Sequence, residues 1–250
     1  MANKSYIIYN GPSLIDGQPI VCIAQVSTTN RKTGDMIQTF IIRSDIDPIT
    51  ASRIGADYSI CGNCPHRGTP TNLDKGQAKG RTCYVTLAHA PLGKYKAFKR
   101  GLYPTVTGHV DIAAIGRGQM VRLGTYGDMS AVPSYVTESL LSEAKGWTAY
   151  THQNDCATAA TNPAVYMTSA ESASEAQAAW GRGERTFRIL ADQADLISGK
   201  EILCPASDEA GKRTTCDRCK LCAGASVKAK SIAIVAHGTA KKAARELVAA

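Results

Sequence analysis

Two kinds of segment are missing from the sequence. No run of apolar residues is long enough to span a bilayer, and the first residues, MANKSYIIYNG, lack the basic and then apolar layout of a secretory signal. Both absences lead us to expect a cytoplasmic protein without membrane segments. The proportions of hydrophobic (44%) and charged (20%) residues are ordinary for a globular chain, and 250 residues allow one large α/β domain or two small ones.

The first of two cysteine sets lacks a fourth member. Nine cysteines are many for a reducing compartment, where metal or cluster ligation is a better explanation than disulfides. Cys22 and Cys156 are isolated, and we expect both to be buried apolar residues. The other seven fall into two sets, one of three and one of four.

The N-terminal set begins in the stretch SICGNCPHRGTP, residues 59 to 70, and consists of Cys61, Cys64 and Cys83. A closed tetrahedral metal site needs four ligands. His66 would complete a zinc site with three cysteines and one histidine. In a [4Fe-4S] cluster, three cysteines would instead leave one iron open, and an open metal position is typical of catalytic sites.

The C-terminal set lies in CPASDEAGKRTTCDRCKLCAG and consists of Cys204, Cys216, Cys219 and Cys222. Its C-x2-C-x2-C run resembles the ferredoxin runs that hold iron–sulfur clusters, and it differs from zinc knuckles, which use separated pairs. We therefore expect a second, closed [4Fe-4S] cluster here, with a four-cysteine zinc site as the alternative.

The hydrophobic pattern predicts an α/β fold. The stretches IVCIAQVSTT and MIQTFIIRS predict a β-hairpin around NRKTGD. From residue 81, short apolar strands alternate with helical segments, which indicates βαβ units and a partial (β/α) barrel. The expected strands are CYVTLA, QMVRLGTY, WTAYTH, AVYMTS, RTFRIL and SIAIVA. The predicted division is an N-terminal hairpin at 1–60, a barrel core at 61–203 and a cysteine-cluster segment at 204–250.

Polar residues follow four of the expected strands. They are Gly127 and Asp128, His152 and Gln153, Ser169 with Glu171 nearby, and His237 with Gly238. The carboxyl ends of parallel strands meet at one edge of the fold, where active sites are built. We therefore expect a pocket there, with Asp128, His152 and His237 as catalytic residues.

The net charge of +8 has two interpretations. It is either a solvated basic surface or an attraction to a polyanion such as DNA or RNA. The stretch GKYKAFKRGLY interleaves basic and aromatic residues, as surfaces that stack on bases do. The same spacing fits an amphipathic helix with its aromatic face in the core.

Three and four cysteines on a partial barrel resemble the radical S-adenosylmethionine enzymes that carry an auxiliary cluster. The resemblance implies that the cluster of Cys61, Cys64 and Cys83 binds S-adenosyl-L-methionine at its open iron. Reduction then cleaves this cofactor to a 5′-deoxyadenosyl radical. The stretch RLGTYGD looks like the glycine-acid motif that holds the amino group of the cofactor, a role that would go to Gly127 and Asp128.

The chain is also similar to cysteine-rich proteins of phages and bacteria, over about residues 55 to 225. The stretches that carry this likeness are CGNCPHR, VRLGTYGD, GWTAYTHQ and CPASDEAGKRTTCDRCKLC. Some phages use radical-type isomerases to hypermodify thymidine in DNA, and such a base would have to leave the stack. The resemblance thus implies an isomerase acting on DNA or a modified nucleotide, with an electron donor, in the host cytoplasm. The alternative is a zinc-stabilised nucleic-acid-binding protein without catalysis.

Overall fold

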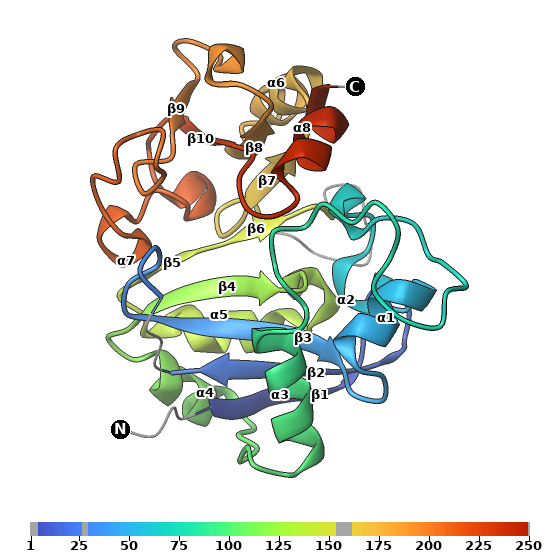
Figure 1. Cartoon of the computed structure of the whole chain (residues 1–250). Coiled ribbons are helices and arrows are strands. Elements are labelled where there is room, and N and C mark those ends of the chain that lie inside the picture. Colours follow the sequence, from blue (N-terminus) through green and yellow to red (C-terminus); the bar gives the residue numbers. More distant parts are fainter. Residues whose placement is uncertain (1–4, 27–29, 154–161, 250) are drawn as a thin grey trace.

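The computed structural model describes residues 5–26, 30–153 and 162–249 and is a mixed α/β fold with two five-stranded sheets (Figure 1). The first sheet has the order β1-β2-β3-β4-β5. Its strands are β1 (Ser5–Pro12), β2 (Pro19–Gln25), β3 (Met36–Arg43), β4 (Met120–Tyr126) and β5 (Gly146–Thr148). The second sheet has the order β6-β7-β8-β10-β9. Its strands are β6 (Tyr150–Thr151), β7 (Met167–Ala170), β8 (Thr186–Leu190), β9 (Glu201–Leu203) and β10 (Ser231–Val235).

The predicted hairpin is confirmed as the antiparallel pair β2–β3, although β1, which the sequence pattern missed, adds a third strand by pairing with β2. From β3 onward every pairing is parallel: β3–β4, β4–β5, β6–β7, β7–β8, β8–β10 and β10–β9. Only Ala149 separates β5 from β6, so the chain passes directly from one sheet to the other. Neither sheet closes on itself within the described ranges.

Helices lie between the strands, as the alternating pattern predicts. The longer ones are α1 (Pro48–Ile54), α3 (Ala90–Lys99), α4 (His109–Gly116), α5 (Ser134–Ser142), α6 (Ala173–Gly181) and α8 (Lys241–Ala249). The four-residue helices are α2 (Tyr58–Cys61) and α7 (Cys216–Cys219). Single turns of 3-10 helix are η1 (Pro65–Arg67), η2 (Met129–Ala131), η3 (Gln193–Asp195) and η4 (Gly224–Ser226). No helix in the described part of the chain is both long and apolar enough to cross a membrane.

The core explains why the central strands are continuously apolar. Every residue of β3 is buried, as are Ile20 to Ala24 of β2, because the inner strands of this sheet are covered on both faces. Cys22 has no exposed surface, which confirms the expectation of a buried apolar residue. Cys156 lies outside the described residues.

The structure tests the expectations for two neighbouring stretches, residues 83–88 and 93–103. The stretch CYVTLA is not a strand: residues 83–88 form turns and irregular backbone ahead of α3, so the prediction was wrong. For GKYKAFKRGLY the amphipathic alternative is confirmed. Tyr95, Phe98 and Tyr103 pack against the core, and Lys94 is itself buried, with its ammonium over the Phe40 and Tyr103 rings. The aromatic side of this segment therefore packs against the core and is partly buried.

Candidate functional site

One cavity of about 420 Å³ contains the site and is lined by residues of both sheets. All seven cysteines of the two sets line it, as do Gly127, Asp128, His152 and His237. Residues far apart in the chain, such as Cys61 and His237, thus meet at one cavity. A volume of several hundred Å³ is typical of pockets for cofactors and small molecules.

The N-terminal set follows β3 in the chain. Helix α2 ends at Cys61, and Gly62 continues at φ 51°, a conformation that favours glycine. The carbonyl of His66 accepts hydrogen bonds from the backbone N–H groups of Thr82 and Cys83, which brings the third cysteine back to the first two. Arg81 donates to the carbonyl of Cys83 at 3.1 Å and fixes it there.

The side chain of Gln153 makes two hydrogen bonds to the loop between Cys61 and Cys64. Its amide Nε2 donates to the carbonyl of Cys61 at 3.0 Å, and its Oε1 accepts from the backbone N–H of Asn63 at 3.3 Å. The side chain is buried and does not face the cavity. Gln153 is therefore a positioning residue for the cysteines.

Replacing Gln153 with alanine should weaken metal binding by the N-terminal set. Groups that orient metal ligands typically contribute about 10–100-fold to metal affinity. We expect Gln153→Ala to lose metal from Cys61, Cys64 and Cys83 at chelator concentrations that leave the C-terminal set loaded. The measurement is metal per chain during a chelator titration, with the exposed Gln193→Ala as the control. Equal retention by all three proteins would contradict this role.

The C-terminal set comes from two segments of the chain, one with Cys204 and one with Cys216, Cys219 and Cys222. Cys204 follows β9, and its N–H donates to the carbonyl of Ala233 in β10. Helix α7 carries Cys216 and Cys219, and the N–H of Cys216 donates to the carbonyl of Lys32, just before β3. This set thus lies near the start of β3, whereas the N-terminal set follows the end of that strand.

Burial raises the pKa of five of these thiols, those of Cys61, Cys83, Cys216, Cys219 and Cys222. It raises the pKa of Cys61 well above the ordinary value, an effect that the Asp57 carboxylate and the other two cysteines reinforce. Burial likewise raises the pKa of Cys222 to about 12. A nucleophilic cysteine needs a lowered pKa. These thiols are suited instead to metal ions, which displace the proton on binding.

The sulfur spacing bears on which metal could bind. All eight described cysteines are free. Among the described residues, the one group of three or more possible ligands within 4.8 Å of one another contains no cysteine. Around one zinc ion, two sulfurs at about 2.3 Å from the metal cannot be more than about 4.6 Å apart. In an iron–sulfur cluster each thiolate binds a different iron, so its sulfurs lie further apart than those around a single ion.

Tyr84, Arg122 and Tyr150 connect the two sets. Tyr84 directly follows Cys83, and its hydroxyl accepts a hydrogen bond from Arg122 Nη2 at 2.6 Å. The guanidinium lies 5.8 Å from the centre of the Tyr150 ring, and no carboxylate within the described residues pairs with it. Arg122 therefore presents a positive charge to the cavity between two groups of thiols.

Gly127 and Asp128 follow β4 as predicted, and the Asp128 carboxylate accepts three hydrogen bonds. Its Oδ1 accepts from the N–H of Ser130 at 3.0 Å, and its Oδ2 accepts from the Thr151 hydroxyl at 2.9 Å and the His152 N–H at 3.0 Å. A carboxylate has about four acceptor positions, so one remains for another donor. Asp128 thus ties the end of β4 to the end of β6 and positions His152.

Gly127 cannot be replaced without strain. Its φ of 83° is one that side chains rarely adopt, and an added Cβ would lie 2.9 Å from Cβ of Ile41 in β3. We expect Gly127→Ala to lower the free energy of unfolding by about 1–3 kcal/mol in a urea titration. Gly17→Ala is the matched control, because Gly17 has φ 76° but nothing within 4 Å of the added atom. Equal losses in both variants would mean that the contact with Ile41 adds nothing.

Three buried hydroxyls that line the cavity have no hydrogen-bond partner among the described residues: those of Thr125, Tyr126 and Thr148. A buried polar group without a partner costs about 1–3 kcal/mol, so such groups are rare unless something else satisfies them. All three line the cavity beside Gly127 and Asp128. They fit a polar molecule bound there.

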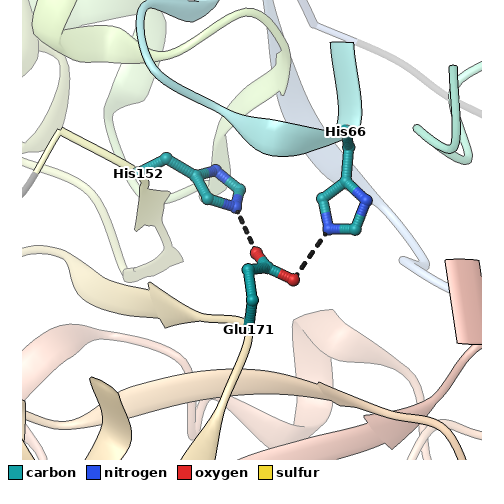
Figure 2. Close-up of side chains that lie close together, drawn as sticks. All are labelled: His66, His152 and Glu171. Atoms are coloured by element: carbon teal, nitrogen blue, oxygen red, sulfur yellow. Dashed lines mark hydrogen bonds and ion pairs between the residues drawn. The ribbon is translucent and has the colours of Figure 1, made fainter. Parts of the chain in front are cut away.

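His152, Glu171 and His66 meet at the same cavity (Figure 2). The Glu171 carboxylate lies between the two rings, with Oε1 at 2.8 Å from His152 Nε2 and Oε2 at 3.0 Å from His66 Nε2. His152 Nε2 is also 3.9 Å from the Cys64 sulfur. The sequence predicted His152 as catalytic, but gave Glu171 no role beyond its place near a strand end.

The remaining predicted residues are also accounted for. His237 lines the cavity, where its Nε2 lies 3.5 Å from Lys32 Nζ. His66 does not approach the cysteine sulfurs as a fourth ligand would, because its Nδ1 contacts the Thr82 hydroxyl at 2.7 Å and its Nε2 contacts Glu171. The roles of Asp128, His152 and His237 in catalysis stay predictions.

No family model, no curated protein and no solved structure matches the chain.

Proposed function

We propose that the protein is an iron–sulfur enzyme of the radical S-adenosylmethionine type. The observation that carries this proposal is that a set of three cysteines and a set of four cysteines line one cavity. A zinc-stabilised binding module would have no need to direct both of its metal sites into one pocket. In the proposed arrangement, Cys61, Cys64 and Cys83 hold an open [4Fe-4S] cluster and Cys204, Cys216, Cys219 and Cys222 hold a closed one.

The strand order supports the same proposal. The strands β3, β4, β5/β6, β7 and β8 run in parallel and in chain order, as in an incomplete (β/α) barrel. In that order, the three-cysteine loop follows the first strand and Gly127–Asp128 follows the second. The proposed barrel would thus place the cluster and the cofactor motif at neighbouring strand ends.

The cavity has groups suited to S-adenosyl-L-methionine beside the N-terminal set. The unpartnered hydroxyls of Thr125, Tyr126 and Thr148 could take hydrogen bonds from it, and Arg122 could pair with a carboxylate. Together the cluster and this cofactor would supply a 5′-deoxyadenosyl radical for hydrogen abstraction. The protein would orient the reactants and exclude water, since apolar side chains such as Phe187, Ile189 and Ile232 line the same cavity.

For the substrate we propose a base carried by DNA or a modified nucleotide, most specifically an amino-acid-modified thymidine that is isomerised. Its support is the net charge of +8, which favours a polyanion, and an internal cavity that a base could enter only after leaving the stack. His152 and His237 would lie on the substrate side.

The test is reductive cleavage of S-adenosyl-L-methionine. The protein, purified without oxygen and loaded with iron and sulfide, should form 5′-deoxyadenosine when reduced with dithionite. Cys83→Ser should form none, whereas Cys22→Ala, which changes a buried cysteine away from the cavity, should keep the activity. A fully loaded wild-type protein that forms no 5′-deoxyadenosine would contradict the proposal.

A further inference from the structure

We propose that His66, His152 and Glu171 form a site for one divalent transition-metal ion, which uses none of the cysteines as ligands although His152 Nε2 lies 3.9 Å from the Cys64 sulfur. The inference depends only on these three side chains and does not require that the cysteines hold iron. It goes beyond the proposed function, since that function gives none of the three a metal.

The two distances from the Glu171 carboxylate fit ligands around one ion. Glu171 Oε1 lies 2.8 Å from His152 Nε2 and Oε2 lies 3.0 Å from His66 Nε2, and the ligand atoms of all three residues are within 4.8 Å of one another. Histidine nitrogen and carboxylate oxygen bind zinc at about 2.1 Å. Two such ligands at a right angle are about 3.0 Å apart by the same bond length.

The ring of His66 is held by a side chain behind it, and the backbones of His152 and Glu171 are held by carboxylates. Thr82 contacts Nδ1 of His66 at 2.7 Å and leaves Nε2 for the metal. The backbone N–H of His152 donates to Asp128, and that of Glu171 donates to Glu175 Oε2 at 2.7 Å. Such outer contacts typically fix the rings and carboxylates of metal sites. The three ligands come from separate segments, namely η1 and the residues that follow β6 and β7.

Charge favours a cation at this place. The Glu171 carboxylate accepts at both oxygens, from His152 Nε2 at Oε1 and from His66 Nε2 at Oε2. Each contact between this carboxylate and a ring nitrogen therefore needs a proton on the nitrogen. A divalent ion between the three side chains would replace those protons and attract the carboxylate more strongly.

Two histidines and one carboxylate are a typical set for zinc or non-haem iron(II), and they leave coordination positions open. His66, His152 and Glu171 all line the cavity. The open positions would therefore face whatever molecule the cavity binds, and they suit an oxygen or nitrogen group of that molecule.

Cobalt(II) is the probe, because its X-ray absorption edge is distinct from that of iron. Protein already loaded at the cysteines, by iron and sulfide or by zinc, is dialysed against Co²⁺, and cobalt, iron, zinc and sulfide are counted per chain. We expect one additional cobalt in the wild-type protein. Its absorption spectrum should show nitrogen and oxygen neighbours with imidazole scattering, and no sulfur at about 2.3 Å.

Glu171→Gln keeps the size of the side chain and should lower cobalt affinity at least tenfold while iron, zinc and sulfide stay unchanged. His152→Ala should do the same, and the exposed His89→Ala is the matched control with unchanged binding. Equal cobalt in wild-type and Glu171→Gln protein, or a sulfur neighbour of cobalt, would overturn the proposal. A wild-type protein that binds the cobalt but holds no iron and no sulfide would count against the cysteine clusters. It would not count against the site of His66, His152 and Glu171.

Discussion

Replacing Cys216 and Cys219 together with serine is expected to remove half of the bound iron, about four of eight atoms, along with half of the sulfide. The two residues belong to the set near the start of β3, and the set after its end has its own backbone supports. Replacing Cys61 and Cys64 should remove the other half. Iron and sulfide per chain, measured after oxygen-free loading, provide the comparison.

The two double variants should differ in activity although they lose equal iron. Without Cys61 and Cys64, cleavage of S-adenosyl-L-methionine should be abolished. Without Cys216 and Cys219, the N-terminal cluster should still be formed. Cys22→Ala is the control and should keep all of the iron, because Cys22 is buried within β2, away from the cavity. If either pair of replacements removed all of the iron, the division into three and four would be wrong.

Arg185→Ala is expected to have the largest effect on stability outside the cysteines. The buried guanidinium donates to four backbone carbonyls, at 2.6 Å to Leu221 and Lys230 and 2.9 Å to Gly224 and Ala229. These carbonyls belong to the segment that includes Cys222. Leaving several buried acceptors without a donor should cost on the order of 3 kcal/mol or more.

The measurement for Arg185→Ala is urea unfolding together with metal content, and the C-terminal set should lose its metal first. Arg185→Lys should rescue little, since an ammonium cannot reach all four carbonyls in the geometry of a planar guanidinium. Arg117→Ala is the control: Arg117 pairs with Glu143 at the surface, where a salt bridge contributes about 0–1 kcal/mol. A loss in Arg185→Ala no larger than in Arg117→Ala would refute this role.

The parts of the fold that could be predicted are those with a strong local pattern. β4, β8 and β10 are short apolar runs bounded by turns, and α6 begins at Ser172, whose side chain accepts from the N–H of Glu175. The stretch at 83–88 has an equally apolar pattern but is not a strand. Its backbone is instead held by Arg81, which donates to the carbonyls of Cys83 and Val85. Hydrogen bonds from one side chain to nearby carbonyls leave no periodic trace in the sequence.

For the candidate site, too, only part of the arrangement could be predicted from the sequence. The positions after successive strands correctly indicated that Asp128, His152 and Glu171 lie near one another, because the ends of parallel strands share an edge. What those side chains do could not be predicted. Asp128 accepts three hydrogen bonds from groups of the protein itself. Gln153 does not line the cavity and donates instead to the carbonyl of Cys61 in the cysteine loop. Such partners are set by packing between segments far apart in the chain.

The most direct test of the two-cluster account is the metal content of protein purified without oxygen. Iron, acid-labile sulfide and zinc are counted per chain, and the absorbance near 400 nm is recorded before and after reduction. The account predicts a brown protein with about eight iron and eight sulfide per chain, and with absorbance that falls on reduction. A colourless protein that contains two zinc ions at the cysteines and no sulfide would contradict it.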